Sequence, residues 1–255
     1  VESGADFFNR HLDENQTFSN FVVGRSNAQA QIASLTCATN LGMIYNPLFI
    51  YGGSGVGKTH LANAIGNHVK LLNPEKRVLF VSANTFKLQY QSAVAGNRIP
   101  DFLNFYQSID VLIMDDIQYL AGLARTQDTF FHIFNHLQQS RKQLILTSDR
   151  SPLQLKDIEE RLLTRFKWGL SAEIERPDYQ LRKDILLNKM RRDGLMLPDD
   201  VINFVANNVR DSVRDLDGIL ATLYAYSTML NSEINMSLAE QVVSRIVEIR
   251  PQNIQ

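Results

Sequence analysis

Residues 48–59 read LFIYGGSGVGKT, and this stretch decides the fold. Its first four residues are apolar, as in a buried strand, and a run with helical spacing begins at Lys58 and Thr59. Between the two, the glycines fit the pattern G-x-x-x-x-G-K-[ST] of a loop that wraps phosphate groups. A strand, a glycine-rich loop and a helix in this order predict an α/β domain with the loop at the carboxyl end of a parallel strand.

The residue types in this loop suit the binding of ATP or ADP with Mg²⁺. Glycines let backbone N–H groups turn inward around phosphates, and the helix that follows adds its positive N-terminal end. Lys58 reaches the β- and γ-phosphates, and the Thr59 hydroxyl helps to hold Mg²⁺. A glycine-rich turn without a ligand is the alternative, but a chance match has odds of about one in a hundred in a chain of this length. The predicted nucleotide-binding residues are Gly53, Ser54, Gly55, Val56, Gly57, Lys58, Thr59 and His60.

Further short, unbroken apolar runs at 78–81, 111–114 and 144–146 predict more strands. Unbroken rather than alternating runs are typical of a parallel sheet that is covered on both faces. Helical stretches at about 58–72, 84–106 and 127–140 lie between them. The alternation predicts a parallel sheet in an α/β/α sandwich.

The second part of the chain has no further strand-like run after about residue 172. Helices are expected at about 177–192, from 198 and over 213–230, and a capping box at Ser237 and Glu240 predicts the start of another. The expected organisation is a flexible tail over 1–17, a nucleotide-binding α/β domain over 18–172 and a helical lid domain over 173–247. Residues 248–255 are expected to link to a further domain.

Composition is that of an ordinary globular protein, with 44% apolar and 21% charged residues among 255 and a net charge of −1. A protein that grips duplex DNA through its phosphates is usually more basic, so any DNA contact is expected to be local. Cys37 is the only cysteine, which excludes an internal disulfide. No apolar run has the length of a membrane span and no signal peptide is recognisable, so we expect a cytoplasmic protein. The chain begins at Val1 rather than at Met, and we expect a piece of a longer protein.

Acidic residues follow two of the predicted strands. Asp115 and Asp116 come directly after 111–114, and Asp149 follows 144–146. Because ligands of parallel sheets bind beyond the carboxyl ends of the strands, these acids are expected at the same crevice as Lys58. We predict that Asp115 holds Mg²⁺ and that Asp116 orients or deprotonates the attacking water.

Arg161 and Arg165 are four residues apart and are expected on one face of a helix. The spacing alone favours surface ion pairs with Asp157, Glu159 or Glu160. The alternative is an arginine that reaches the γ-phosphate bound by a neighbouring subunit.

Several longer stretches resemble the AAA+ family and, within it, the bacterial chromosomal replication initiators. The resemblance runs from about Thr17 to the last residue. The stretches are FSNFVVG (18–24), NPLFIYGG (46–53), DDIQYLAG (115–122), TSDR (147–150), RFKWGL (165–170) and VRDLDG (213–218).

The resemblance implies residue roles at the nucleotide. Phe21, Val22 and Val23 are implied to pack around adenine. Asp149 is implied to be the sensor at the γ-phosphate, and Arg214 to reach the nucleotide from the helical lid.

Roles at the assembly are implied in the same way. Arg165 is implied to act as a finger on the ATP of the next subunit, with Arg161 supporting that interface. Most AAA+ proteins carry Glu at the position of Asp116, and the shorter Asp fits a slow ATPase that works as a switch. Arg125 is implied to contact single-stranded DNA, whereas Leu123 stands where the family often has a second basic residue.

The implied function is a replication initiator whose ATP-bound subunits assemble into a filament that opens the origin. Its partners are other copies of itself, single-stranded origin DNA and the replicative helicase machinery. Residues 251–255 resemble the first residues of a helix-turn-helix domain, through which the longer protein would bind duplex DNA. The alternatives are a stand-alone regulator related to the initiator, a helicase-loader ATPase and a small-molecule P-loop kinase.

Overall fold

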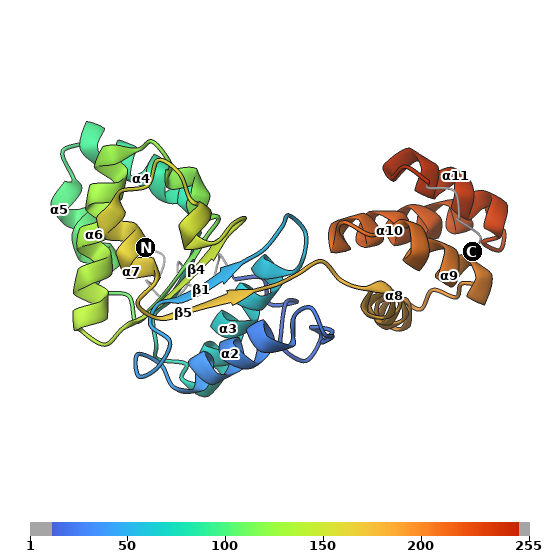
Figure 1. Cartoon of the computed structure of the whole chain (residues 1–255), viewed down its shortest axis with the longest axis horizontal. Helices are drawn as coiled ribbons and strands as arrows, with labels where there is room; N and C mark the ends of the chain where they lie inside the picture. Colours follow the sequence, from blue (N-terminus) through green and yellow to red (C-terminus); the bar gives the residue numbers. More distant parts are fainter. Residues whose placement is uncertain (1–11, 250–255) are drawn as a thin grey trace. The chain divides into compact units, whose positions relative to one another are not determined.

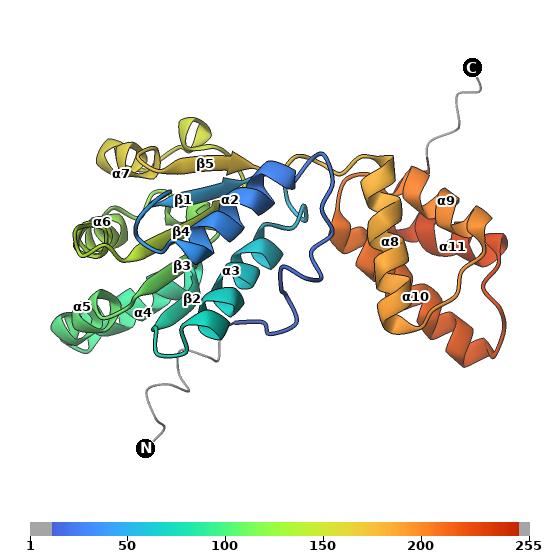
Figure 2. The same cartoon turned by 90° about the horizontal axis from the view of Figure 1, so that it is seen from below.

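A computed structural model describes residues 12–249 of the chain. It contains a five-stranded parallel sheet (Figure 1), whose strand order β2-β3-β4-β1-β5 can be followed in Figure 2. The strands are β1 (Leu48–Tyr51), β2 (Val78–Ser82), β3 (Val111–Asp115), β4 (Gln143–Ser148) and β5 (Leu170–Glu173). The predicted parallel sheet and its four predicted strands are confirmed.

The fifth strand was missed because its sequence does not have the pattern of the others. β5 pairs only with β1 and forms an edge of the sheet. Of its four residues only Ala172 is buried, and Ser171 and Glu173 are exposed. An edge strand needs no unbroken apolar run, because one of its sides is not covered by a neighbouring strand.

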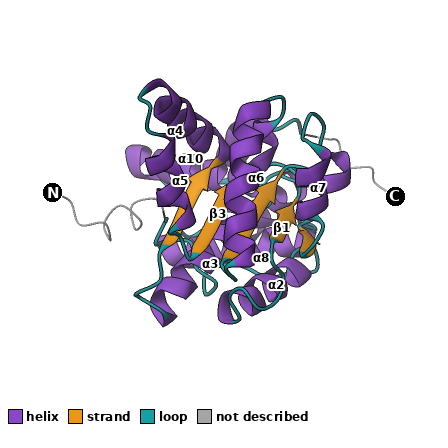
Figure 3. Ribbon diagram, turned by 90° about the vertical axis from the view of Figure 1, so that its left-hand side faces the viewer, coloured by secondary structure: helices purple, strands orange, loops and turns teal. Residues whose placement is uncertain are grey.

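Helices cover both faces of the sheet (Figure 2). On one face lie α2 and α3, and on the other lie α4, α5, α6 and α7, of which α5 and α6 stand in front of the strands in Figure 3. Two 3₁₀ turns, η1 and η2, follow β3 and β4. The bounds are α2 Ala28–Thr39, α3 Lys58–Leu72, α4 Ala83–Ala95, α5 Ile99–Gln107, η1 Ile117–Leu120, α6 Ala124–Gln139, η2 Pro152–Gln154 and α7 Glu160–Phe166.

The single helix predicted over 84–106 is wrong, because α4 and α5 are separate helices. Helix α4 ends at Gly96, and Asn97 takes a left-handed conformation with φ 53°. An α-helix cannot continue through that conformation, which asparagine tolerates better than most residues. Pro100 then lies in the first turn of α5, where its missing N–H costs nothing.

Side chains of the central strands alternate between the two faces. Leu112 and Leu146 belong to a core that also contains Phe86, whose ring lies 5.0 Å from Tyr106 and 5.7 Å from Phe130 in edge-to-face contacts. Ile113 faces α3, with its Cδ1 3.1 Å from the position that a Cβ on Gly66 would take. Both faces are buried, which holds the sheet rigid beneath the loops at its carboxyl edge.

The segment before α2 is held against α3 by several hydrogen bonds. Leu12 is buried, and the Asp13 N–H donates to Asn63 Oδ1 at 3.0 Å. Asn67 Nδ2 donates to the carbonyls of Asp13 and Gln16, at 2.8 and 2.9 Å. Residues 12–17 are therefore packed rather than part of the tail that the sequence predicted, and residues 1–11 lie outside the described part of the chain.

A second core unites the four helices that follow β5. These helices bury a continuous apolar cluster, to which α8 contributes Leu186, α9 contributes Val205 and α10 contributes Leu216. Their bounds are α8 Tyr179–Asp193, α9 Asp199–Asn208, α10 Val213–Leu230 and α11 Met236–Ile246. The predicted all-helical second part is confirmed.

The capping box predicted at Ser237 and Glu240 is wrong, because α11 begins two residues earlier. Asn235 caps the helix, and its Oδ1 accepts the N–H of Leu238 at 2.9 Å. Asparagine is among the residues that cap helix N-termini best, so it competes successfully with the serine.

Arg182 is buried inside this helical part although it carries a charge. Its Nε donates to the carbonyl of Ala206 in α9 at 2.7 Å, and its Nη1 donates to the carbonyl of Pro177 at 2.8 Å. The guanidinium thereby joins the start of α8 to the end of α9.

Contacts divide the chain into two compact units. Among the described residues, the first comprises 12–21, 29–53 and 58–174, and the second comprises Val22–Ala28, Ser54–Gly57 and residues 175–249. The sequence placed the limit of the α/β domain at residue 172. Of the predicted linker 248–255, residues 250–255 lie outside the described part. No helix within residues 12–249 combines the length and apolar character needed to cross a bilayer.

We predict that the thiol of Cys37 does not react with a disulfide reagent in the native protein. Cys37 is fully buried in α2, and burial raises the pKa of its thiol to about 12. Because the thiolate is the reactive form, at about pH 8 a native sample should stay unlabelled. The same sample should label at once in concentrated guanidinium chloride. Absorbance of the released thiol follows the reaction, and rapid native labelling would mean that α2 opens readily.

Candidate nucleotide-binding site

The glycine-rich loop joins β1 to α3. Gly55 and Gly57 have φ values of 73° and 113°, a region that residues with a side chain rarely adopt. The glycines therefore allow a turn that brings the chain from the end of β1 directly into the N-terminus of α3. Helix α3 is 15 residues long and begins at Lys58, so the free N–H groups of its first turn lie at the end of the loop.

Lys58 is almost completely buried beside the loop, with 7% of its surface exposed. Its Nζ donates to the carbonyls of Gly52 and Gly53, each at 2.6 Å. These carbonyls hold the ammonium at the turn, the position that the sequence predicted for a phosphate-binding cation.

Asp115 is also buried and ends β3. Its carboxylate accepts hydrogen bonds from two hydroxyls. Thr147 Oγ1 of β4 donates to Oδ1 at 2.5 Å, and Thr59 Oγ1 of α3 lies 3.1 Å from Oδ2. The structure thus brings Thr59 and Asp115 together as the sequence predicted, and adds Thr147, to which the sequence reasoning assigned no role.

Burial raises the pKa of the Asp115 carboxyl above its usual value, and the neighbouring charge of Asp116 raises it too. The hydrogen bonds from Thr147 and Thr59 and the charge of Lys58 lower the same pKa. These groups act in opposite directions, so the hydroxyls favour the ionised carboxylate against the cost of burial.

The oxygen atoms of Asp115 and Thr59 fit Mg²⁺. They are hard donors, and Mg²⁺ is commonly held by one or two protein oxygens together with phosphates and waters. Within residues 12–249 no three His, Cys, Asp or Glu side chains gather to hold a metal ion by themselves. The donor set therefore suits a metal that arrives with a phosphate ligand rather than a caged structural ion.

Asp116 takes a left-handed conformation, with φ 57° and ψ 56°. Its N–H donates to Thr147 Oγ1 at 2.9 Å, and its Oδ1 accepts from Gln118 Nε2 at 3.3 Å. Left-handed backbone is strained for a residue with a side chain, although Asp tolerates it better than most. The turn separates the direction of Asp116 from that of Asp115.

Gln118 joins this acid to the end of β4. Its Oε1 accepts the N–H of Asp149 at 3.3 Å, while its Nε2 contacts Asp116. The carboxylate of Asp149 pairs with Arg150 through two hydrogen bonds of 2.9 and 3.0 Å. Gln118 was missed because its two partners lie on different loops, and its own sequence position carries no signal.

The three residues implied to pack around adenine have different surroundings. Phe21 is buried, and its ring lies edge-on to that of His60, with 5.2 Å between the centroids. His60 Nε2 lies 2.9 Å from the Thr17 carbonyl. Val22 packs against the core of the helical unit, and Val23 is 47% exposed.

Arg214 lies in the first turn of α10. Its N–H donates to the side chain of Ser212, which caps the helix. The N–H of Val213 donates to the Gly55 carbonyl at 2.8 Å, and a Cβ on Gly55 would lie only 2.1 Å from Ser212 Oγ. The absence of a side chain at Gly55 thus permits its close contact with the N-terminus of α10.

The two arginines of α7 form a separate group with α6. Arg161 donates to Asp128 at 2.5 Å and to Glu159 at 2.7 Å, and these hydrogen bonds raise its pKa, the one to Asp128 most. The expected pairing with Glu159 is confirmed, whereas Asp128 was not foreseen. The guanidinium carbon of Arg165 instead lies 3.8 Å from the ring centroid of Trp168.

Arg125, the residue implied to contact single-stranded DNA, is exposed in the first turn of α6. Leu123, which stands where the family often has a second basic residue, precedes the helix and is half-buried. Arg125 is therefore accessible to a phosphate backbone.

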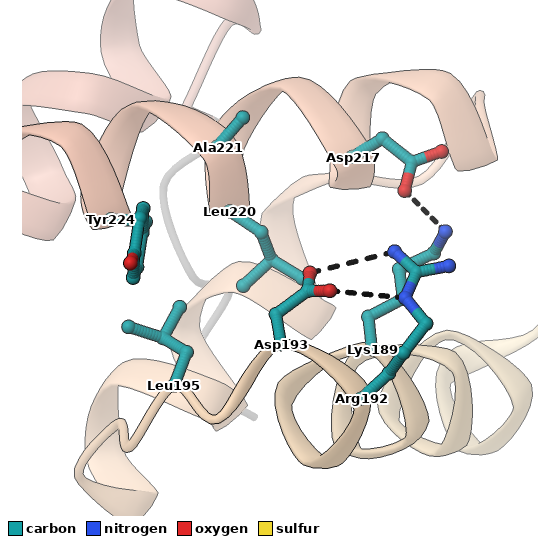
Figure 4. A pocket seen from close by; sticks show the side chains of 8 residues that line it. All are labelled: Lys189, Arg192, Asp193, Leu195, Asp217, Leu220, Ala221 and Tyr224. Carbon is teal, nitrogen blue, oxygen red and sulfur yellow. Dashed lines mark hydrogen bonds and ion pairs between the residues drawn. The ribbon is translucent and has the colours of Figure 1, made fainter.

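A cavity of about 560 Å³ opens on the helical unit between α8 and α10 (Figure 4). Ion pairs join Lys189 to Asp217 and Arg192 to Asp193 along its wall. None of its lining residues is a predicted nucleotide-binding residue, so this cavity is distinct from the glycine-rich loop.

Comparisons with known proteins give one consistent family. The chain matches the family described as the bacterial DnaA ATPase domain over residues 12–173. It is 56% identical to the chromosomal replication initiator protein DnaA of Bacteroides fragilis over 238 residues, which are 93% of this chain and 50% of that protein. The chain spans about half the length of the curated relatives it matches.

Solved structures give the same result. Domain III of the Thermotoga maritima replication initiation protein DnaA is similar with a TM-score of 0.90 and 38% identity, over 93% of this chain and 99% of that one. A replication initiator DnaA bound to AMPPCP and single-stranded DNA is similar with a TM-score of 0.79 and 39% identity, over 84% of this chain and 66% of that one. The predicted AAA+ fold is thereby confirmed. A match over most of the α/β unit, together with a domain structure that aligns over nearly its whole length, places this chain in the family of bacterial DnaA ATPase domains.

Proposed function

We propose that this chain binds ATP with Mg²⁺, hydrolyses it slowly and uses the bound nucleotide as a switch for self-assembly. The observation that carries the proposal is the Asp115 carboxylate, buried next to the phosphate-binding loop and held by the hydroxyls of Thr59 and Thr147. In the ATP state the subunits form a filament that opens the replication origin. A relative with 39% identity that binds AMPPCP and single-stranded DNA supports this proposal over a small-molecule kinase.

The phosphates bind to the loop 53–57 and to the N-terminus of α3. The loop and the first turn of α3 supply N–H donors, and Lys58 supplies a full positive charge to the β- and γ-phosphates. Lys58 already lies at the turn, held by carbonyls that a phosphate oxygen can replace as its partner. Phe21, Val22 and Val23 pack around the adenine, and Arg214 contacts the nucleotide from α10.

Asp115 and Thr59 hold the metal ion. When bound, Mg²⁺ neutralises charge on the β- and γ-phosphates and polarises the γ-phosphoryl group. Thr147 keeps Asp115 ionised and fixes its orientation. The backbone N–H of Asp116 shares the same threonine hydroxyl, so one side chain sets the positions of both acids.

Asp116 orients the attacking water and accepts its proton, and Asp149 senses the γ-phosphate. Asp116 is one methylene shorter than glutamate and is held by Gln118, which restricts its reach to the water. A general base that lies too far from the attacking water gives slow ATP hydrolysis, which suits a nucleotide switch. Gln118 also contacts the Asp149 N–H, so loss of the γ-phosphate at Asp149 is coupled to the position of Asp116.

Arg165 acts on the ATP of an adjoining subunit, and Arg161 supports that interface. Arginine suits the role because its planar fork of N–H groups fits phosphate oxygens. Among the described residues, Arg165 has an aromatic neighbour rather than a carboxylate, whereas two carboxylates already occupy Arg161.

DNA binding follows from assembly. One subunit offers little beyond Arg125, and a net charge of −1 gives little attraction to phosphates. A filament repeats this weak site along one strand, which raises the affinity by effective concentration. The assembled subunits present the open origin to the replicative helicase machinery in the cytoplasm.

We predict that Thr147→Val weakens Mg²⁺-dependent ATP binding by roughly tenfold or more, the order expected for a lost hydrogen bond to a charged group. The substitution removes a hydrogen bond that lowers the pKa of Asp115, so that pKa rises further. A protonated carboxyl cannot hold Mg²⁺, and the variant should therefore lose binding at a higher pH than the parent as the pH falls. Titration with a fluorescent ATP analogue at several pH values, with Mg²⁺ and with EDTA, measures the effect. Thr129→Val, at a buried threonine of α6, is the control, and parallel pH profiles for both variants would contradict the prediction.

Asp116→Asn should keep ATP bound and slow its hydrolysis by roughly a hundredfold or more, the contribution of a general base. Lys58→Ala should lose ATP binding, because it removes the positive charge at the β- and γ-phosphates. Calorimetry gives the affinity, and single-turnover release of phosphate gives the rate. Equal loss of binding in both variants would show that the two residues do not have separate roles.

Arg165→Ala should bind ATP normally as a dilute monomer but fail to form ATP-dependent oligomers. Lys167→Ala, which removes an exposed cation two residues away, should assemble like the parent chain. Sedimentation with ATP and with ADP over a range of protein concentrations tests this. A defect of Arg165→Ala in monomers too dilute to assemble would place its action within its own subunit.

A further inference from the structure

Among the described residues, the guanidinium of Arg165 contacts aromatic rings and no carboxylate. Its central carbon lies 3.8 Å from the Trp168 ring centroid and 5.5 Å from that of Phe131. Its neighbour Arg161 also lies over Phe131, at 4.2 Å, but is bound by Asp128 and Glu159 as well. Both arginines of this short helix thus contact Phe131, but among the described residues only Arg161 also forms ion pairs.

The backbone holds Trp168 in place beside Arg165. Helix α7 ends at Phe166, and the Trp168 N–H donates to the Arg165 carbonyl at 3.1 Å, which turns the chain back. The next residue, Gly169, lies so close to Pro47 that a Cβ on it would come within 1.9 Å of the Pro47 carbonyl oxygen. Trp168 is thus fixed between the end of α7 and the start of β5, although 55% of its surface is exposed.

Stacking leaves the hydrogen-bonding capacity of the guanidinium unused. Its five N–H groups lie in the plane of the group, and a ring above that plane does not compete for them. A carboxylate partner would occupy the same N–H groups and would have to be displaced by an incoming phosphate. Arg161 has such partners, and Arg165 has none among the described residues.

We propose that Trp168 is a positioning residue for Arg165, which it holds stacked and ready to meet the γ-phosphate bound by an adjoining copy of this chain. The inference rests on the proposed action of Arg165 on a neighbouring subunit. Trp168 limits the motion of a long side chain before assembly, so less entropy is lost when the interface forms. Phe131 is the second aromatic face, shared with Arg161.

The chain offers a direct readout, because Trp168 is its only tryptophan. A guanidinium that covers one face of the indole shields it from a neutral quencher. Acrylamide should therefore quench the emission more strongly in Arg165→Ala than in the parent chain, with the protein dilute and monomeric. Lys167→Ala should leave quenching unchanged. Equal quenching in the parent and in Arg165→Ala would overturn the stacking in solution.

A matched pair of variants tests the consequence for assembly. Trp168→Leu removes the aromatic face, and Trp168→Phe keeps a smaller one. An exposed cation–π contact is worth about two- to fivefold in an equilibrium, so Trp168→Leu should weaken ATP-dependent self-association by about that factor. Trp168→Phe should recover most of it. The ATP affinity of each dilute variant serves as the check on folding, since Trp168 lies outside the nucleotide-binding group.

The outcomes separate this inference from the proposed function. If Arg165→Ala fails to assemble while Trp168→Leu and Trp168→Phe both assemble like the parent, the role of Trp168 is wrong and that of Arg165 stands. If Arg165→Ala assembles like the parent, the action on a neighbouring subunit is wrong, and the role of Trp168 falls with it. The inference is supported if Trp168→Phe weakens ATP-dependent self-association slightly, Trp168→Leu weakens it more, and Arg165→Ala increases the quenching.

Discussion

The position of β4 between β3 and β1 determines the chemistry of the site. Because all three strands are parallel, their carboxyl ends lie at one edge, and Thr147 of β4 stands between the end of β3 and the loop that follows β1. Its hydroxyl reaches Asp115 from one side while Thr59 reaches it from the other. Without these donors the buried carboxylate would be compensated only by the nearby charge of Lys58, and a poorly compensated buried charge costs several kcal/mol. The strand order is therefore a condition for an ionised acid at this position.

A common rule governs the charged groups that we assign to the nucleotide. Lys58 donates hydrogen bonds to backbone carbonyls, and Asp115 accepts hydrogen bonds from hydroxyls. Arg165 instead makes a cation–π contact with an aromatic ring. These hydrogen-bond and ring partners carry no formal charge, and the charges of Lys58 and Asp115 also act on each other. Asp149 departs from the rule, because Arg150 pairs with it.

The sequence was sufficient for features that are local along the chain. The apolar strands, the glycine-rich loop and the acids after β3 each have their signal within about ten residues, and the structure contains them at the predicted positions. Gln118, Thr147 and the partnership of Asp128 with Arg161 were not predictable, because each depends on which segments become neighbours in space. The break at Asn97 was missed for a different reason. Apolar spacing continues through it, and only the backbone conformation shows where one helix ends and the next begins.

Arg182 has a consequence for how the helical unit can respond to a ligand. Its charge is satisfied by two backbone carbonyls at fixed places, one before α8 and one near the end of α9. If α8 slid along α9 by one turn, the guanidinium would lose the Ala206 carbonyl of α9 while it remained buried, because Pro177 precedes α8 and would move with it. Sliding of α8 along α9 therefore costs free energy, because it breaks a buried hydrogen bond. A movement of all the helices together breaks none. The buried arginine therefore ties α8 to α9, and we expect these two helices to move together as one body.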